Sequence, residues 1–411
     1  MTAPGVMVMF GLELAELGWL DWWMIGALAV SGFALLVSSI NLAAFRVAPE
    51  EPKSDDEGWS LTVCVPARDE EENLEACVRS ILRAADADPR SRTEVMVYDD
   101  GSTDRTPEIL ARLVEEDSRV LAAEVEPLPE GWNGKQHACD AMGRQAEGDW
   151  LLFTDADVRF EPSSLRRTRA ALHARSRPER PIALLSAFPG ERTGSIGESL
   201  IVPMIHVILL SYLPFGRMRR TLDPAASAAC GQFILCRRSI WTEVGGHGAI
   251  RDSMHDGVHL PRVFRRQGHA TDLFDGTDIV SCRMYHGFSE TWHGFAKNAY
   301  EGLGNPVLLV LLTVLHLGGQ VAPWIVAGIA ALGAFGGLDV ATPAISTFAL
   351  GCASTAILIQ LLLRSRLAAR FDQSWVGVML HPVGLLVLTA IQWWSLRLHL
   401  VGRRSWRGRI A

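Results

Sequence analysis

The sequence predicts an α/β domain with a doubly wound, Rossmann-like and mostly parallel sheet, joined to transmembrane α-helices. Three observations carry this prediction. Apolar stretches long enough to span a bilayer occur near both ends of the 411 residues. Strand and helix patterns alternate along the charged middle of the chain, which favours parallel strands linked by helices. Pairs of acidic residues follow two of the expected strands, where sheets of this kind bind their ligands.

The composition agrees with a soluble domain joined to membrane segments. The mean hydropathy of +0.15 is high for a soluble enzyme, yet 46 acidic and 39 basic residues are too many for a membrane bundle. The net charge of −7 argues against a nucleic-acid partner. The seven cysteines form no Cys-x-x-Cys pair, which indicates reduced thiols rather than a disulfide framework or a structural zinc site.

The first candidate span is Trp22–Phe45, which carries no charge. As a helix it would be about 36 Å long, enough to cross a bilayer core. Acidic residues precede it and Arg46 follows it, so the positive-inside rule places residues 1–21 outside the cell and the following chain in the cytoplasm. Because no basic segment precedes the stretch, we expect an uncleaved anchor in the cell membrane. Residues 46–60, rich in Pro, Glu and Asp, indicate a linker.

Three further spans are expected within residues 305–396. They are about Pro306–Gly336, Ala341–Leu363 and Trp375–Leu396. Arginines after the second of these place the loop that follows it inside; they are Arg364, Arg366 and Arg370. Four spans would then return the basic tail, residues 397–411, to the outside, against the same rule. Either the stretch from Pro306 forms two short, partly re-entrant pieces, or one C-terminal stretch lies on the membrane surface. The sequence leaves both alternatives open.

The charged middle, residues 61–304, shows the pattern of one folded domain. Apolar runs predict three strands, and the spacing of apolar residues predicts helices between them. The expected strands are Leu61–Val65, Val95–Tyr98 and Trp150–Thr154, and the expected helices are Asp69–Leu82 and Thr106–Val114.

One apolar stretch inside this domain, Leu200–Phe215, is interrupted by two prolines and is short for a membrane span. Arg217, Arg219 and Arg220 follow it, as expected for a helix that lies against anionic headgroups. A buried core helix would explain the same residues.

Two acid pairs stand at expected strand ends. Asp155 and Asp157 flank Ala156, and two carboxylates so placed can hold Mg²⁺ or Mn²⁺ or form a solvated turn. Asp99 and Asp100 precede a Gly-Ser pair, so they could bind a nucleotide or only form a turn and a helix cap.

Lys135 and Asp256 lie next to glycine-rich segments. Lys135 could reach a phosphate as a point charge, although neither the P-loop nor the dinucleotide-binding glycine spacing is present. Asp256 could act as a general base or cap its helix. We interpret the nearby His247, His255 and His259 as cap or surface residues rather than as a metal site.

Taken in order, these motifs resemble those of the GT-A fold glycosyltransferases of family 2. The resemblance covers about residues 60–302 and rests on Val65–Glu71, Tyr98–Asp104, Gly134-Lys135, Thr154–Asp157, Gly245–His247 and Asp256. The segment Ser289–Asn298 departs from the Q-x-x-R-W motif of processive members, which implies a non-processive enzyme. The Cys282–Tyr285 segment and the pattern from Trp292 to Asn298 are similar to the subgroup that glycosylates carotenoid-type or hopanoid-type lipids.

The resemblance implies a role for each candidate residue. Those that would bind the donor are Pro66, Ala67, Arg68, Glu70, Asp99, Asp100, Lys135, Asp155, Ala156 and Asp157. Asp157, together with Asp155, would hold Mg²⁺ or Mn²⁺. Asp256 would take the place of the catalytic base, although the usual Glu-Asp pair reads His255-Asp256 here. The residues expected near the acceptor and the membrane are Cys230, Gly231, Gln232, Trp292 and Lys297.

These roles imply an inverting, metal-dependent hexosyltransferase with a cytoplasmic active site. It would move a sugar from a nucleotide-sugar donor, with a UDP-sugar favoured, to a terpenoid-like membrane lipid. Three alternatives remain open: a polyprenyl-phosphate sugar synthase, a membrane transporter with a nucleotide-sugar-binding regulatory domain, and an inactive scaffold that binds a nucleotide sugar.

Overall fold

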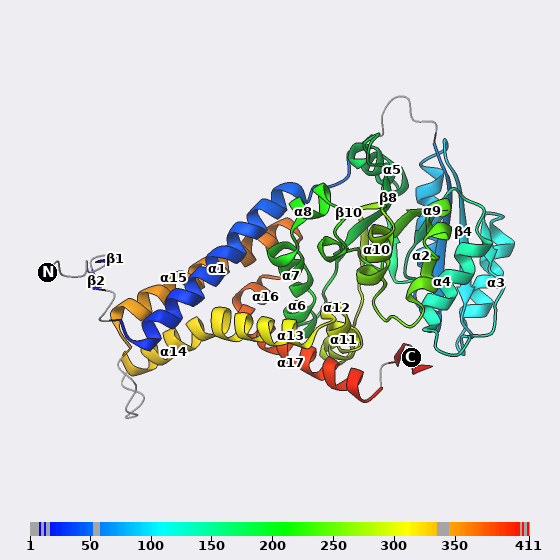
Figure 1. The fold of residues 1–411 in the computed structure, drawn as a ribbon. Helices are drawn as coiled ribbons and strands as arrows, with labels where there is room; N and C mark the ends of the chain where they lie inside the picture. The colour runs from blue at the N-terminus through cyan, green and yellow to red at the C-terminus, as the bar shows by residue number, and fades with distance from the viewer. Residues whose placement is uncertain are drawn as a thin grey trace.

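The structure, a computed structural model, describes residues 17–51, 58–334 and 345–402. It also describes the backbone of four short strands, β1 (Val8–Met9), β2 (Leu12–Glu13), β11 (Ser405–Trp406) and β12 (Arg409–Ile410). The predicted N-terminal segment, linker and basic tail therefore lie partly outside the described residues. Figure 1 shows an α/β domain at one end of the molecule and long helices that extend away from it.

Eight strands form the sheet of the α/β domain. They are β3 (Ser60–Ala67), β4 (Arg92–Asp99), β5 (Val120–Ala122), β6 (Trp150–Phe153), β7 (Val158–Phe160), β8 (Ile182–Glu191), β9 (Ile234–Arg237) and β10 (Ala270–Cys282). Their order is β5-β4-β3-β6-β9-β8-β10-β7. The first four in this order run parallel, as predicted, and so do β8 and β10. In contrast, β9 is antiparallel to both of its neighbours and β7 is antiparallel to β10, so the sheet is mixed.

Helices cover both faces of this sheet. One face packs against α2 (Leu74–Asp86), α3 (Thr106–Glu116) and α5 (Ser164–Arg175), and the other packs against α4 (Gly134–Gln145), α9 (Arg238–Glu243) and α10 (Asp256–Arg266). Successive strand residues point to opposite faces. Val63 and Val65 accordingly lie in the first core and Cys64 lies in the second. Burial on both faces explains why these strands read as continuous apolar runs.

The first helix of the domain begins later than its predicted start at Asp69. Asp69 has a positive φ of 53°, and its carboxylate accepts a hydrogen bond of 2.7 Å from the backbone N–H of Thr103. The backbone N–H of Glu70 donates to the hydroxyl of Thr106 at 2.8 Å. These bonds tie the segment to the loop after β4, so the helix begins only at Leu74.

Four helices are long and apolar enough to cross a membrane. They are α1 (Trp19–Ala44), the stretch Pro306–Ala334, α15 (Thr347–Arg370) and α17 (His381–Leu400). The second comprises α13 (Pro306–Thr313), the π-helical segment Val314–Val321 and α14 (Ala322–Ala334), and it runs without a break. The alternative of two short, partly re-entrant pieces is therefore wrong. The predicted span from Trp375 is divided, because α16 (Trp375–Met379) precedes α17.

Polar side chains in these long helices bond to one another or to the domain. The side chain of Gln320 lies 3.2 Å from the ring of His381 and donates to the hydroxyl of Tyr212 at 3.2 Å. Gln360 donates to Ser31 at 3.0 Å. Such pairs hold these helices to one another and to the domain, so they have a structural explanation that requires no transport pathway.

The apolar stretch within the domain is a buried connector. It forms α6 (Ile196–Ile201) and α7 (Met204–Tyr212), and α8 (Phe215–Arg220) follows. The side-chain amide of Asn41 in α1 donates to the backbone carbonyls of Leu210 and Leu213 at 2.7 and 2.8 Å. The structure thus supports the interpretation as a core helix, since α7 packs between the domain and the long helices.

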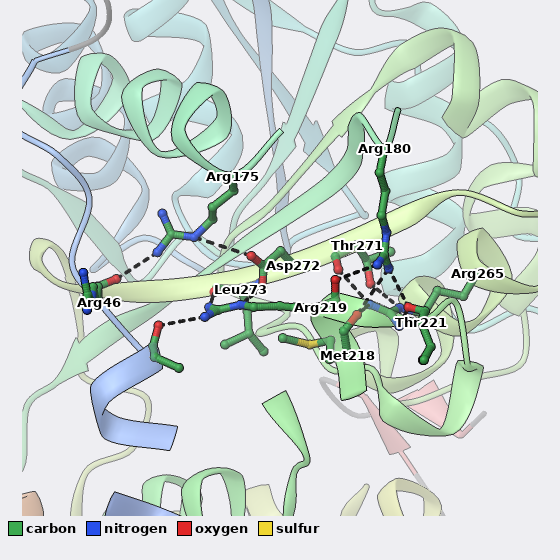
Figure 2. A network of polar contacts seen from close by, with 11 residues as sticks. Arg46, Arg175, Arg180, Met218, Arg219, Thr221, Arg265, Thr271, Asp272 and Leu273 are labelled. Carbon is green, nitrogen blue, oxygen red and sulfur yellow. Dashed lines mark hydrogen bonds and ion pairs between the residues drawn. The ribbon is translucent and has the colours of Figure 1, made fainter. Parts of the chain in front are cut away.

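A polar network fixes α1 and α8 to the sheet (Figure 2). The carboxylate of Asp272, in β10, lies 3.1 Å from Nε of Arg219 and 3.6 Å from Nε of Arg175. The same two arginines donate to the backbone carbonyls of Ala44 and Arg46 at the end of α1, at 2.9 and 3.1 Å. One buried carboxylate therefore anchors a long helix, α5 and α8 together.

Two further arginines in this network close the C-terminal end of α8. Arg265 donates to the carbonyls of Met218 and Thr221 at 2.8 and 3.1 Å, and Arg180 donates to the same two carbonyls. Cations at a helix C-terminus satisfy carbonyls that lack a partner within the helix.

α17 contacts the α/β domain at both of its ends. Near its start, a Cβ added to Gly384 would lie 2.8 Å from the carbonyl oxygen of Leu200 in α6. Near its end, the hydroxyl of Ser395 accepts from the backbone N–H of Tyr300, in α12 (Ala299–Leu303), at 2.9 Å, and the ring of His399 lies 5.1 Å from the Tyr300 ring. In Figure 1, α1, α14 and α15 run together away from the sheet, whereas α17 lies beside α11 (Gly287–Ala296).

Candidate active site

Four charged side chains meet at the carboxyl ends of the central strands. Asp155 and Asp157 lie in the turn after β6, Lys135 lies in the first turn of α4, and Asp256 is the first residue of α10. Nζ of Lys135 is 2.7 Å from Oδ1 of Asp155 and 3.1 Å from Oδ2 of Asp256. The lysine thus links the Asp-x-Asp motif to the predicted base, although the two are about 100 residues apart in the chain.

The local sequence explains how Lys135 and Asp256 are placed. Asn133 caps α4, because its side-chain oxygen accepts from the backbone N–H of Lys135 at 2.9 Å and from that of Gln136 at 3.4 Å. Asp256 packs directly against Gly231, where an added Cβ would lie 2.3 Å from Oδ1 of Asp256. A glycine is therefore required there for this close approach.

The electrostatics of the group favour charged Lys135 and ionised Asp256. Burial would lower the pKa of Lys135, but the charges of Asp155 and Asp256 outweigh it and hold that pKa well above its usual value. Burial would likewise raise the pKa of Asp256, but Lys135 holds it below its usual value. Burial, with the charges of Asp155 and Glu70, raises the pKa of Asp157 to about 7. Because burial is the largest cause of this shift, a cation bound directly to Asp157 would favour its ionised form.

The predicted nucleotide-binding residues lie together at the ends of β3 and β4. Pro66–Ala67 forms the last part of β3. A guanidinium nitrogen of Arg68 donates to the backbone carbonyl of Asp100 at 2.6 Å and lies 3.5 Å from its carboxylate. The carboxylate of Asp99 accepts from the backbone N–H of Ser102 at 3.0 Å, so it also forms the turn expected from its sequence.

The Asp-x-Asp motif fits a divalent cation with two protein ligands. Oδ1 of Asp157 is buried and has no hydrogen-bond partner in the described structure. Across the described ranges, no group of three or more His, Cys, Asp or Glu side chains could hold a metal ion. Mg²⁺ or Mn²⁺ held by Asp157 and Asp155 would thus take its other oxygens from a bound ligand and water, which is usual for Mg²⁺.

Two of the three histidines around Asp256 contact other side chains. His255 and His259 are four residues apart, the spacing of helical zinc ligands, and Nε2 of His259 lies 3.6 Å from a carboxylate oxygen of Glu301. The indole N–H of Trp241 donates to Nδ1 of His247 at 3.1 Å. His247 is fully buried, so the interpretation of this residue as a cap or surface histidine is wrong.

Three of the expected acceptor residues lie near the acids. Cys230, Gly231 and Gln232 precede β9. The Gln232 amide donates to Sγ of Cys282 at 3.0 Å, and Sγ of Cys230 lies 3.3 Å from the Gln232 carbonyl oxygen. Together with the contact between Gly231 and Asp256, these bonds position residues 230–232 beside the predicted base.

The other two expected acceptor residues lie on the membrane side. Trp292 is in α11 and packs with Leu200 of α6 and Ile391 of α17. Lys297 follows the end of the same helix. The structure therefore places Trp292 against the long helices, one turn before the end of the helix that Lys297 follows.

Two hollows connect Asp157 with the long helices. A cavity of about 350 Å³ is lined by Asp157, Arg159, Arg192 and Arg283, among others. A second, of about 630 Å³, shares Arg192 with the first and reaches residues 370–374, at and after the end of α15.

Three charged residues that line these hollows, Glu191, Arg192 and Arg283, were not predicted from the sequence. Glu191 ends β8, Arg192 follows it, and Arg283 directly follows β10. Burial raises the pKa of Glu191 well above its usual range. Charged residues at the end of a predicted strand were the pattern that identified the acid pairs. The same pattern would have identified these three residues if β8 and β10 had been predicted.

The fold and this site define the class of protein. Residues 62–245 match the family described as glycosyl transferase family 2. The chain thus carries a family 2 glycosyltransferase domain and is a glycosyltransferase of the GT-A fold, with four helices that could span a membrane.

Two staphylococcal glycosyltransferases are similar to this chain in sequence. The chain is 27% identical to the 4,4'-diaponeurosporenoate glycosyltransferase of Staphylococcus aureus (strain USA300) over 271 residues, which cover 64% of this chain and 67% of that one. It is 24% identical to the protein of the same name from Staphylococcus haemolyticus (strain JCSC1435) over 296 residues, 71% of this chain and 74% of that one. The resemblance to the carotenoid-associated subgroup is therefore confirmed.

One solved structure resembles the whole molecule. It is mannosyltransferase PcManGT from Pyrobaculum calidifontis in complex with GDP-Man and Mn²⁺, with a TM-score of 0.54 and 18% sequence identity. The match covers 91% of this chain and 99% of that one, and it confirms the GT-A fold.

Proposed function

We propose that this glycosyltransferase moves a sugar from a nucleotide-sugar donor, with a UDP-sugar favoured, to a terpenoid or carotenoid-like membrane lipid. The reaction would be inverting, metal-dependent and non-processive. The observation that carries the proposal is the joining of the Asp-x-Asp motif to Asp256 through Lys135, beside a hollow that leads to the long helices.

The donor would lie across the ends of β3, β4 and β6. Arg68, Asp99 and Asp100 stand at the first two of these ends, where an open α/β sheet binds its nucleotide. The diphosphate would lie near Lys135, whose positive charge is fixed by two carboxylates. Mg²⁺ or Mn²⁺ held by Asp157 and Asp155 would stabilise the negative charge of the departing nucleoside diphosphate.

The chemical step needs an oxygen nucleophile on the face of the sugar opposite the diphosphate. As that oxygen forms its bond to the anomeric carbon, the bond to the diphosphate breaks and the electron pair leaves with the nucleoside diphosphate. Asp256 would accept the acceptor's proton whenever the acceptor carries one. The ion pair with Lys135 supports this role, since it holds Asp256 ionised and in one position.

The lipid acceptor is supported by the names of the relatives and by the long helices. The staphylococcal proteins are named for diaponeurosporenoate, a lipid-like carotenoid acid. In this chain the hollow of about 630 Å³ lies between the sheet and the end of α15. A lipid lying among the helices could therefore bring its head group to Asp157 through this hollow.

The same proposal places the catalytic domain in the cytoplasm. It is supported by the acids before α1, by Arg46 after it, and by the arginines at the end of α15. We place α17 along the membrane surface, and its contacts with α6 near its start and with α12 near its end support this placement. Three spans then keep the basic tail in the cytoplasm, as the positive-inside rule requires.

The test is to incubate membranes that contain the protein with a panel of labelled nucleotide sugars and Mg²⁺ or Mn²⁺, and to identify the labelled lipid. We expect one donor to label a terpenoid lipid, and we expect a chelator to stop the labelling. An acid-labile anionic product would instead identify a polyprenyl-phosphate sugar synthase. Labelling that continues undiminished in a strong chelator would contradict metal dependence.

A further inference from the structure

The hollow beside Asp157 carries positive charge that the protein itself does not neutralise. Three arginines line this cavity of about 350 Å³. Arg283 is paired with the buried carboxylate of Glu198 at 3.3 Å. Arg159 donates only to neutral groups, among them the side-chain oxygen of Asn73 at 3.0 Å.

Arg192 is the most available of these cations. Its side chain is exposed and makes no hydrogen bond or ion pair within the part of the chain that the structure describes. Besides the paired Arg283, the cavity lining thus has two positive charges, Arg159 and Arg192, and one carboxylate, Asp157. The proposed function assigns this carboxylate to a divalent cation. With that cation bound, the cavity would carry a clear excess of positive charge.

The cavity lies on the acceptor side of the site. The proposed nucleotide-binding residues are at the ends of β3 and β4, whereas Arg159 is in β7 and Arg192 follows β8. These strands belong to the opposite half of the sheet, with β6 and Asp157 between the two halves. The cavity also shares Arg192 with the hollow that reaches the end of α15. Arg192 thus lies between the hollow at the end of α15 and the cavity that Asp157 lines.

We propose that Arg159 and Arg192 receive the acceptor as an oxyanion, a carboxylate or a phosphate at the head of a lipid, and that they select it over a neutral alcohol. This inference rests on the proposed function. Guanidinium groups suit both anions, because they donate two parallel N–H bonds to a carboxylate or a phosphate.

An ionised acceptor simplifies the chemical step. One of its oxygens forms the bond to the anomeric carbon, the bond between that carbon and the diphosphate breaks, and the electron pair leaves with the nucleoside diphosphate. No proton has to be removed from the acceptor, so Asp256 would act only through its ion pair with Lys135.

The experiment compares acceptors and variants of the full-length protein in detergent micelles. The acceptors are a terpenoid carboxylic acid, its methyl ester, the corresponding alcohol and a polyprenyl phosphate. The variants are Arg192→Gln and Arg159→Gln, and the control is Arg92→Gln, an exposed arginine far from these cavities. The Arg192 side chain has no partner among the described residues, so its replacement should leave folding intact.

We expect sugar transfer to the acid or to the phosphate and at most a trace with the ester and the alcohol. Arg192→Gln should raise the KM for the anionic acceptor by about tenfold or more, with the KM for the donor and the kcat little changed. Arg92→Gln should match the wild type. A base-labile glycosyl ester identifies the carboxylate as the acceptor group, and an acid-labile phosphodiester identifies the phosphate.

Efficient transfer to the alcohol would overturn the inference and leave the proposed function standing. The inference would also be overturned if Arg192→Gln raised the KM for the donor and not the KM for the acceptor, because Arg192 would then bind the diphosphate. If the wild type labels no lipid with any donor, the proposed function itself fails.

Discussion

Gly231 shows how closely single residues are fitted in this site. A Cβ at this position would lie 2.3 Å from Oδ1 of Asp256, so Gly231→Ala must push the carboxylate away from Lys135. We expect kcat for sugar transfer to fall roughly 100-fold, because displacements of about 1 Å have effects of that size on catalysis. The measurement is steady-state transfer by the purified variant.

The control for that variant is Gly351→Ala, since nothing lies within 4 Å of the added Cβ there. We expect this change in α15 to leave activity unaltered. An unchanged kcat in Gly231→Ala would contradict the position that the structure gives to Asp256.

The structure brings the predicted acids and Lys135 together, but the sequence did not predict the contacts between them. Asp155, Asp157 and Asp256 were found because acids follow an apolar strand or precede a helix. The bond between Lys135 and both sides of the site joins residues far apart in the chain, and no local pattern encodes it. Arg192 was missed for the related reason that the strand before it was not predicted.

Among the elements, β10 connects the α/β domain to the long helices through the side chain of Asp272. Asp272 is 4% exposed and is the carboxylate that faces both Arg175 and Arg219. Burial lowers the pKa of Arg175, and the charge of Asp272 opposes that effect. Asp272→Asn would leave two partly buried guanidinium groups without a counter-charge. We expect the free energy of unfolding to fall by about 2 kcal/mol, less than for a fully buried pair because Arg219 is partly exposed.

That loss is measured as a lowered thermal midpoint of the purified protein in detergent. The matched control is Glu147→Gln, which removes an acid that is 81% exposed and lies 3.9 Å from Arg92. An exposed ion pair of this kind contributes little to stability, so the thermal midpoint of Glu147→Gln should equal that of the wild type within experimental scatter. Equal shifts in the two variants would show that the Asp272 network does not anchor the helices.

The elements themselves were predicted unevenly, for physical reasons. The parallel strands β3, β4 and β6 read as apolar runs because both of their faces are buried. The start of the first helix was placed too early, since Asp69 has helical spacing but is held by Thr103 in a loop. The antiparallel insertion of β9 depends on contacts across the sheet and has no local signal.

For the whole molecule, we propose three membrane spans and one helix, α17, on the membrane surface. We expect a reporter fused after residue 402 to be active in the cytoplasm, and one inserted between α14 and α15 to be active outside the cell. The physical reason is that basic segments resist translocation, and Arg397 with the arginines of the tail makes this end strongly basic.

The control for these fusions is an insertion in the predicted linker before Trp59, which should report the cytoplasm in every case. Activity of the C-terminal reporter outside the cell would mean that α17 crosses the bilayer. The sequence alone left this matter open because length and hydropathy are the same for a span and for a surface helix. The proposal that α17 is a surface helix rests on its contacts near both ends.

The central claim is that Asp157 supports transfer of a sugar from a nucleotide donor to a lipid. Its most direct test is the simultaneous measurement of labelled lipid and of released nucleoside diphosphate, for the wild type and for Asp157→Asn. We expect the wild type to form labelled lipid and nucleoside diphosphate in equal amounts. In Asp157→Asn we expect both products to fall by roughly 100-fold or more, while the thermal midpoint stays unchanged. Full turnover by a folded Asp157→Asn would contradict the claim.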